Sequence, residues 1–225
     1  MNDTDRIAIL FDIDGTLIIS GGAGAASWRL AFDELYGIPA DIGEFTDTGM
    51  TDPDVGRKTF EAVLHRKPED DEFAKLLERR LHYLHRTVAD SKGYRVLPGV
   101  EELLPKLLHD GYLLGIVTGN LEPAAHIKLY RSGLNRYFSF GGYGSDSTDR
   151  VELTRIALER GALVYGAPLP PEQAIVVGDT PHDVEGAHGA GMKCVGVASH
   201  NFNADQLREG DADWVIDSLT EGLPL

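Results

Sequence analysis

Two aspartates spaced two residues apart follow a short apolar run near the start of the chain. Residues 7–11 are all apolar and predict a strand buried on both faces, with Asp12 and Asp14 at its carboxyl end. Carboxylates held this close repel each other, so the pair costs stability unless a cation lies between them or one of them takes a proton. The spacing therefore indicates a chemical site. The alternative is that Asp14-Gly15-Thr16 is only a turn, for which these residue types are favoured.

A second acidic pair follows another apolar run. Residues 174–177 predict a buried strand, Asp179 follows after one glycine, and Asp183 comes four positions later. A structural explanation also exists, because Asp179 or Thr180 can cap a helix and Asp183 would favour the helix dipole. In a chain that already has one acidic pair at a strand end, the second pair favours a shared site.

A hydroxyl and a short polar turn follow a third apolar run. Residues 112–117 predict a strand, and Thr118-Gly119-Asn120 comes directly after it. A hydroxyl and exposed backbone N–H groups at a strand end supply donors for phosphate oxygens without adding a mobile charge. The same triplet is also a good turn and helix start.

The elements that must position these residues alternate along the second half of the chain. Alternating strands and helices predict an α/β fold, a parallel sheet covered by helices on both faces. In such a sheet ligands bind beyond the carboxyl ends of the strands, where all the residues above are expected. Helices are expected at 100–109, 123–132, 151–160 and 183–190, and further strands at 137–140, 193–198 and 214–216.

The segment between the first strand and this alternating region is different. Trp28, Ala31, Phe32 and Leu35 fall at helical spacing, as do several apolar residues in 73–84, and no buried strand is evident. Residues 18–95 are therefore expected to be a helical insert in a core formed by 1–17 and 96–225. Residues 18–26 are rich in glycine and are expected to be a flexible connection.

Composition narrows the class of protein. A net charge of -15 opposes general binding to nucleic acid or anionic membranes, and no apolar run of about 18 residues exists to span a bilayer. The first residues are acidic and resemble no targeting segment, and the single cysteine, Cys194, lies in an apolar segment. We expect a cytoplasmic protein without disulfides.

Residues 11–17 resemble the first signature of the haloacid dehalogenase superfamily, whose members are mostly phosphatases, and the later segments resemble its other signatures. The resemblance implies a Rossmann-like core, a helical class I cap and, within the superfamily, a phosphoglycolate phosphatase-like subgroup. It implies that Asp12 is a nucleophile that becomes an aspartyl phosphate and that Asp14, kept protonated by its neighbour, is the general acid and base. It assigns phosphoryl binding to Thr118 and charge compensation to Arg150, with Arg155 as the alternative.

The resemblance also implies a magnesium cofactor and a phosphate site. Mg²⁺ prefers one or two carboxylates together with waters and phosphate oxygens. The expected ligands are Asp12, Asp179 and the carbonyl of Asp14, with Asp183 binding the metal directly or holding its ligands. The expected phosphate-binding residues are Gly15, Thr16, Thr118, Gly119, Asn120 and Arg150.

The implied partner is a small phosphorylated metabolite. We expect neither nucleic acid nor a membrane as a partner, and we expect the protein to be a monomer or a homodimer. In the cap loop Met50 stands where relatives often carry a basic residue, which predicts a preference for substrates that lack a second anionic group. Three alternatives stay open: a dehalogenase, which Asp14 and the second acidic pair oppose; a phosphomutase with the same residues; and a receiver-like phosphoryl-binding switch, which is about half this length.

Overall fold

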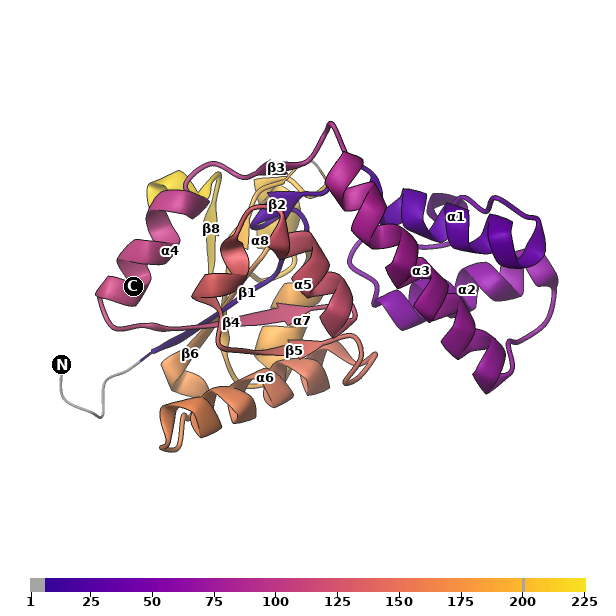
Figure 1. Ribbon diagram of the computed structural model, residues 1–225. Coiled ribbons are helices and arrows are strands. Elements are labelled where there is room, and N and C mark those ends of the chain that lie inside the picture. Colours follow the sequence, from indigo (N-terminus) through magenta and orange to yellow (C-terminus); the bar gives the residue numbers. More distant parts are fainter. Residues whose placement is uncertain (1–6, 200) are drawn as a thin grey trace.

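A parallel six-stranded sheet forms the centre of the molecule in the computed structural model, which describes residues 7–199 and 201–225 (Figure 1). The acidic residues 1–5 lie outside the described residues. The strand order is β5-β4-β1-β6-β7-β8, which confirms the expected α/β class. The strands are β1 (Ala8–Phe11), β4 (Leu113–Thr118), β5 (Phe140–Tyr143), β6 (Ala174–Gly178), β7 (Lys193–Val197) and β8 (Trp214–Ile216).

The first strand lies in the middle of the sheet. β1 pairs in parallel with β4 on one side and β6 on the other, and Phe11 lies opposite both Ile116 and Val177. Because the three strands run in the same direction, their carboxyl ends meet at one edge of the sheet. The chain also reverses its direction of travel across the sheet at β1, which is where open α/β sheets bind ligands.

Helices cover both faces of the sheet, as the uninterrupted apolar strands require. Alternate side chains of β1 serve the two faces: Ile9 and Phe11 pack with α4 (Val100–His109) and α5 (Glu122–Tyr130). Ala8 and Leu10 pack with α6 (Arg150–Tyr165) and α7 (Pro181–Gly189). A last helix, α8 (Ala204–Glu209), contacts β7 and β8. Short 3₁₀ helices occur at Ile42–Glu44, Leu134–Tyr137, Pro171–Gln173 and Leu219–Glu221.

Three further helices pack beside the sheet around a core of their own (Figure 1). They are α1 (Ala23–Tyr36), α2 (Asp52–Leu64) and α3 (Asp70–Asp90). Trp28, Phe32 and Phe60 lie at the centre of this core. A two-stranded antiparallel ribbon of β2 (Ile18–Ile19) and β3 (Arg95–Val96) forms where the helical segment leaves and rejoins the rest.

A small apolar cluster joins the helical segment to the sheet side. Leu84 and Val88 of α3 pack against Leu121 and Ala124 at the start of α5. Within the described residues no helix is both long enough and apolar enough to cross a bilayer.

Three boundaries differ from expectation. The strand expected at 137–140 begins only at Phe140, because residues 134–137 form a 3₁₀ helix. The true strand has two glycines that gave no hydrophobic signal, and a Cβ at Gly142 would lie 1.9 Å from the carbonyl oxygen of Leu153 in α6. The helix expected at 151–160 continues to Tyr165, although its last turns expose Leu163 and Val164. The expected flexible connection at 18–26 contains β2 and the start of α1.

Candidate active site

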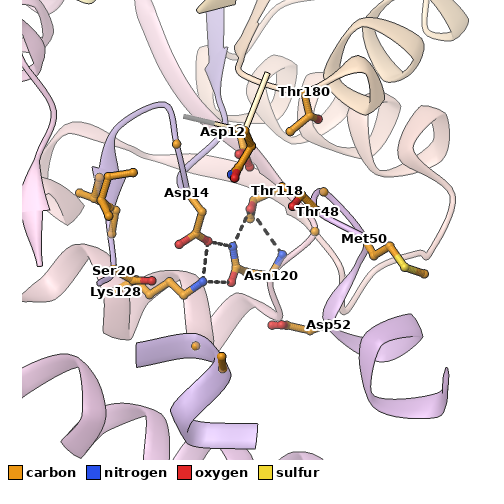
Figure 2. A pocket seen from close by; sticks show the side chains of 18 of the residues that line it. Asp12, Asp14, Ser20, Thr48, Met50, Asp52, Thr118, Asn120, Lys128 and Thr180 are labelled. Atoms are coloured by element: carbon orange, nitrogen blue, oxygen red, sulfur yellow. Dashed lines mark hydrogen bonds and ion pairs between the residues drawn. The ribbon is translucent and has the colours of Figure 1, made fainter. Parts of the chain in front are cut away.

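The carboxyl ends of β1, β4 and β6 bring Asp12, Thr118 and Asp179 together. Asp12 and Thr118 line a cavity of about 310 Å³ between the sheet edge and helices α1–α3 (Figure 2), and Asp179 is buried next to Asp12. The residues on the sheet side of its lining are Asp12, Asp14, Gly15, Thr118, Gly119, Asn120, Lys128, Arg150 and Thr180. Residues 18–25 and the loop at 48–50 line the other side.

Three buried carboxylates lie close together behind the strand ends, and Asp12 is the one that lines the cavity. Asp12, Asp179 and Asp183 each have one oxygen within 4.8 Å of the others, and all three side chains are buried. Among the described residues, neither oxygen of Asp179 has a hydrogen-bond partner. Buried unpaired carboxylate oxygens are costly unless a cation or a proton compensates them. The donor set is all oxygen, which fits Mg²⁺.

The pKa values of two of these carboxylates are raised for the same reason. Burial, together with the nearby charge of Asp183, raises the pKa of Asp12 well above its usual range. Burial and Asp183 also raise the pKa of Asp179, to about 7. In the absence of a cation this cluster therefore holds protons that ordinary aspartates release near pH 4.

Gly15 makes the turn after Asp14 possible. Its φ is +90°, a conformation that L side chains rarely adopt, and a Cβ there would lie 2.1 Å from Oδ2 of Asp179. Thr16, expected to bind phosphate, is fully buried, its hydroxyl has no partner among the described residues, and it does not line the cavity. The turn at Gly15 therefore leaves the Thr16 hydroxyl away from the cavity, and phosphate binding by Thr16 stays a prediction.

Arg150 reaches the acidic cluster from the start of α6. Its helix is capped by Asp149, whose side chain accepts from the N–H groups of Val151 and Glu152. Nη2 of Arg150 lies 2.5 Å from Oδ1 of Asp183, and both side chains are buried. Arg155, the alternative, has 55 % of its side chain exposed and bonds to the carbonyl of Gly189. Of the two arginines, only Arg150 lines the cavity.

Asp183 uses both of its oxygens within the protein. Oδ1 takes the contact with Arg150, and Oδ2 accepts from the backbone N–H of Thr180 at 3.0 Å and from its hydroxyl at 2.8 Å. Asp183 thus also completes the capping box that starts α7. Its place near Asp12 and Asp179 is fixed by these bonds.

A lysine that the sequence analysis missed lies beside Asp14. Nζ of Lys128 is 2.5 Å from Oδ2 of Asp14 and 2.6 Å from Oδ1 of Asn120, and Nδ2 of Asn120 is 2.9 Å from the same Asp14 oxygen (Figure 2). Asn120 also donates to the hydroxyl of Thr118 at 2.9 Å. The turn after β4 and helix α5 are thereby tied to the turn after β1.

This network sets the charge of Asp14. Burial alone would raise the pKa of the Asp14 carboxyl, but the charge and hydrogen bond of Lys128 and the hydrogen bond of Asn120 outweigh it, so the pKa is lowered. The expectation that its neighbour keeps Asp14 protonated is wrong for the ligand-free site. Asp12, not Asp14, is the member of the pair whose pKa is raised.

A signal for Lys128 was present in the sequence. The buried positions of α5 are Ala124, Ala125, Lys128 and Leu129, so the lysine stands in the stripe that faces the core. A lysine on the buried face of a short helix requires a partner, because an unpaired buried ammonium is costly.

The helical segment contributes the other wall of the cavity through Asp52. Oδ1 of Asp52 pairs with Arg80 of α3 at 2.8 Å, and Oδ2 accepts from the backbone N–H of Leu121 at 2.8 Å. The N–H of Asp52 donates to the carbonyl of Gly119 at 2.7 Å. One buried aspartate thus connects α2 and α3 to the turn that follows β4.

Met50 also lines the cavity, where its sulfur accepts from Nζ of Lys58 at 3.6 Å. Arg80, which the sequence analysis did not consider, is the basic residue of the helical segment in the lining, and 1 % of its side chain is exposed. Among the described residues, the Nε and Nη1 atoms of Arg80 have no hydrogen-bond partner, and its guanidinium lies 5.2 Å from the Trp28 ring centroid.

Comparisons with known proteins agree with this architecture. Residues 9–197 match the family model described as haloacid dehalogenase-like hydrolase. The chain is 30% identical over 221 residues to a phosphoglycolate phosphatase of Pasteurella multocida, covering 96% of each. It is 29% identical over 225 residues to the pyrophosphatase PpaX of Bacillus velezensis, covering 98% of this chain and 96% of that one.

A solved structure shares the fold. The crystal structure of a predicted phosphoglycolate phosphatase from Haemophilus somnus superposes with a TM-score of 0.75 at 23% identity, covering 97% of this chain and 96% of that one. The family match spans most of the chain, and it includes all three strand ends that form the site. The chain therefore belongs to the haloacid dehalogenase-like hydrolases and is an enzyme of the phosphatase group within that family.

Proposed function

We propose that this enzyme is a Mg²⁺-dependent phosphatase that hydrolyses a small phosphate monoester through an aspartyl phosphate on Asp12. The observation that carries the proposal is the buried cluster of Asp12, Asp179 and Asp183, of which Asp12 lines a cavity together with Asp14 and Arg150. A nucleophilic carboxylate, a cation site and a compensating arginine are the parts that phosphoryl transfer needs.

Asp12, Asp179 and the carbonyl of Asp14 are the proposed metal ligands. Asp183 serves a different purpose in this proposal, because both of its oxygens are already bonded to Arg150 and Thr180. When bound, Mg²⁺ offsets the charge of the phosphoryl oxygens and of the carboxylates around them. Arg150 and the hydroxyl of Thr118 bind the remaining oxygens from the two sides of β1.

In the first step a carboxylate oxygen of Asp12 attacks phosphorus in line while the bond between phosphorus and the ester oxygen breaks. The departing oxygen takes a proton from Asp14, which lies two residues on, at the same edge of the sheet. Asp14 is ionised in the free site, so this proton has to arrive with the substrate. A phosphate ester, with a second pKa of about 6, is able to carry it.

In the second step Asp14 acts in the state that the free site favours. Its carboxylate takes a proton from a water molecule as the water oxygen attacks phosphorus, and the bond from phosphorus to Asp12 breaks. Inorganic phosphate leaves, Asp12 returns as a carboxylate, and Asp14 releases its proton to solvent as the site empties, because its pKa in the free site is lowered. The same residue thus serves both directions.

Residues 18–95 form the cap in this proposal, and 1–17 with 96–225 form the catalytic core. The bonds of Asp52 to the turn after β4 support a closed cap over the site. A closed cap excludes water other than the attacking molecule. With Met50 in the cavity wall, we expect substrates whose departing group is neutral to be preferred over phosphoglycolate.

The test is hydrolysis of p-nitrophenyl phosphate, glycerol 3-phosphate and phosphoglycolate with Mg²⁺ or with excess EDTA. We expect inorganic phosphate release that requires Mg²⁺, and a phosphorylated Asp12 peptide after acid quenching of the wild type but not of Asp12→Asn. Equal turnover in EDTA contradicts the metal requirement. Phosphorylation at another residue contradicts the assignment of Asp12, and a strong preference for phosphoglycolate contradicts the expected effect of Met50.

A further inference from the structure

Two donors converge on one oxygen of Asp14. Nζ of Lys128 and Nδ2 of Asn120 both bond to Oδ2, at 2.5 Å and 2.9 Å, and these two donors are themselves bonded through Oδ1 of Asn120 at 2.6 Å (Figure 2). The three side chains form a closed ring of interactions. A closed ring restricts each member more than a single bond does.

The other oxygen of Asp14 is left free. No described residue donates a hydrogen bond to Oδ1, and 37 % of the Asp14 side chain is exposed to the cavity. Lys128, by contrast, has 6 % of its side chain exposed. The lysine therefore contacts a substrate much less readily than the carboxylate that it holds.

Packing of helix α5 fixes the position of the Lys128 backbone. Leu129 and Ala125, its neighbours on the buried face, pack into the core beneath the sheet. The carbonyl of Lys128 accepts from the hydroxyl of Tyr94 at 2.8 Å. The ammonium is thus held on a rigid element, and a charged donor gives a stronger bond to a carboxylate than a neutral amide does.

We propose that Lys128 is a positioning residue for the acid–base step. By fixing Oδ2 it orients the Asp14 carboxylate so that Oδ1 faces the ester oxygen and transfers the proton. Correct orientation of a reacting group is worth a large part of its catalytic effect, and Asn120 alone does not supply the charged contact. This inference rests on the proposed function, because it assumes that Asp14 transfers a proton to the departing group.

A double-mutant cycle on kcat/KM tests the inference, because kcat/KM reports the steps up to the first irreversible transfer. With glycerol 3-phosphate, whose departing group needs a proton, we expect Lys128→Met to lower kcat/KM by roughly 10²-fold, the lower end of the effect of a positioned acid–base group. Adding Lys128→Met to Asp14→Asn should change kcat/KM by no more than about twofold. Multiplying losses would overturn the proposal, because they would mean that Lys128 acts independently of Asp14.

The departing group supplies the readout that a structural role would not move. p-Nitrophenolate leaves without a proton, so Lys128→Met and Asp14→Asn should both reduce kcat/KM for p-nitrophenyl phosphate several times less than for glycerol 3-phosphate. Equal losses on both substrates would overturn the proposal. A rise in KM alone, confined to anionic departing groups, would instead make Lys128 a binding residue.

Controls separate this inference from folding and from the proposed function. Lys106→Met makes the same change at an exposed site of α4 and should leave both substrates unaffected. Lys128→Arg, which keeps the cation, should recover part of the loss. If Lys128→Met does not fold, the cycle is repeated with Lys128→Gln. A wild type that hydrolyses no phosphate ester refutes the proposed function, whereas an active wild type with multiplying losses refutes only the role of Lys128.

Discussion

Two ion pairs with a buried cation lie on opposite sides of β1, and they differ in how many hydrogen-bonding positions the carboxylate has left free. Asp183 bonds through both oxygens, to Arg150 and to Thr180, and 1 % of its side chain is exposed. Asp14 bonds through one oxygen, to Lys128 and Asn120, and 37 % of its side chain is exposed. A carboxylate with every oxygen used supports structure, and one with a free oxygen facing a cavity is available for chemistry.

The two cations differ in the same way. Burial would lower the pKa of Arg150, but Asp183 and Asp12 outweigh it and raise that pKa, so the guanidinium stays charged. It lies beside the acidic cluster of Asp12, Asp179 and Asp183. Lys128 lies instead beside the carboxylate that exchanges a proton in the proposed mechanism. In the proposed mechanism, charge compensation therefore falls to α6, which follows β5, and the positioning of the proton-transferring carboxylate falls to α5, which follows β4.

The largest expected effect is the loss of turnover when Asp14, the carboxylate with a free oxygen, is replaced. Asp14→Asn should lower turnover of glycerol 3-phosphate by roughly 10²- to 10⁴-fold, because a positioned acid–base group supplies about that factor. The asparagine keeps an oxygen that accepts from Lys128, so the free energy of unfolding should change by no more than about 1 kcal/mol. Steady-state kinetics and urea unfolding check both values. A variant with wild-type turnover would remove Asp14 from the mechanism.

Breaking the pair of Arg150 and Asp183 should lower both stability and activity. Arg150→Ala leaves Asp183 buried without its cation, which should lower the free energy of unfolding by about 3–5 kcal/mol. Turnover should fall by roughly 10²- to 10³-fold, since a donor to the phosphoryl oxygens is lost. Arg155→Ala is the matched control from the same helix, and its exposed side chain predicts a change within about 0.5 kcal/mol. The reverse ranking would assign the role to Arg155.

The sequence predicted the surroundings of Arg150 better than the contact of Lys128 with Asp14, and the reason is physical. Asp12 and Asp179 follow apolar runs that end at the same edge of a parallel sheet, so their meeting follows from the fold alone. Arg150 follows a capping aspartate at a helix start, which is also a local pattern. Lys128 and Asp14 are 114 residues apart, and their contact depends on how α5 rotates its buried stripe toward the turn after β1. No local pattern reports that rotation, although the lysine in the stripe shows that a partner exists.

The charge of Asp14 was predicted wrongly for the same reason. Repulsion from Asp12 was visible in the sequence, but the two donors that stabilise the ionised form come from residues 120 and 128. The start of α1 was missed because Gly21 and Gly22 adopt positive φ just before it, where the sequence read only as a flexible stretch. In each case the tertiary arrangement decided what local preference left open.

A third ion pair, Asp52 with Arg80, sharpens the comparison because Asp52 also bonds to the N–H of Leu121 and so connects the proposed cap to the proposed core. Asp52→Ala removes the acceptor for Arg80 and for the N–H of Leu121, which should cost about 2 kcal/mol or more. If this free energy is lost from closure of the proposed cap and not from folding of the proposed core, kcat/KM should drop by roughly 30-fold while the core stays folded. Hydrogen exchange at the N–H groups of Leu121 and of residue 52, which donates to the carbonyl of Gly119, measures the opening. Asp33→Ala, at an exposed site of α1, is the control, and unchanged exchange in Asp52→Ala would contradict the role of Asp52 as a cap contact.

The smallest expected effect concerns the buried carboxylates near Arg150, where protons compete with Mg²⁺ for the same oxygens. Burial and Asp183 raise the pKa of Asp179 to about 7, above its value near 4 in the unfolded chain. A raised folded-state pKa contributes stability that is fully present below pH 4 and is lost as the pH rises through 7, so the metal-free protein loses this contribution over that window. Metal ligands must be deprotonated, and the pKa of Asp12 is raised as well, so Mg²⁺ affinity should rise as the pH rises through 7.

Thermal unfolding with and without Mg²⁺ measures this competition. At a fixed Mg²⁺ concentration the metal-induced rise in Tm should be larger at pH 7.5 than at pH 5.5, because up to about tenfold in affinity is gained per pH unit for each proton displaced. Each kcal/mol should appear as roughly 2–4 °C in a chain of this size. Asp14→Asn keeps the acidic cluster and should show the same pH dependence, since Asp14 contributes only its carbonyl to the proposed site. A Tm shift that is independent of pH, or one that Asp14→Asn abolishes, would mean that the cation binds at the Asp14 carboxylate rather than among Asp12, Asp179 and Asp183.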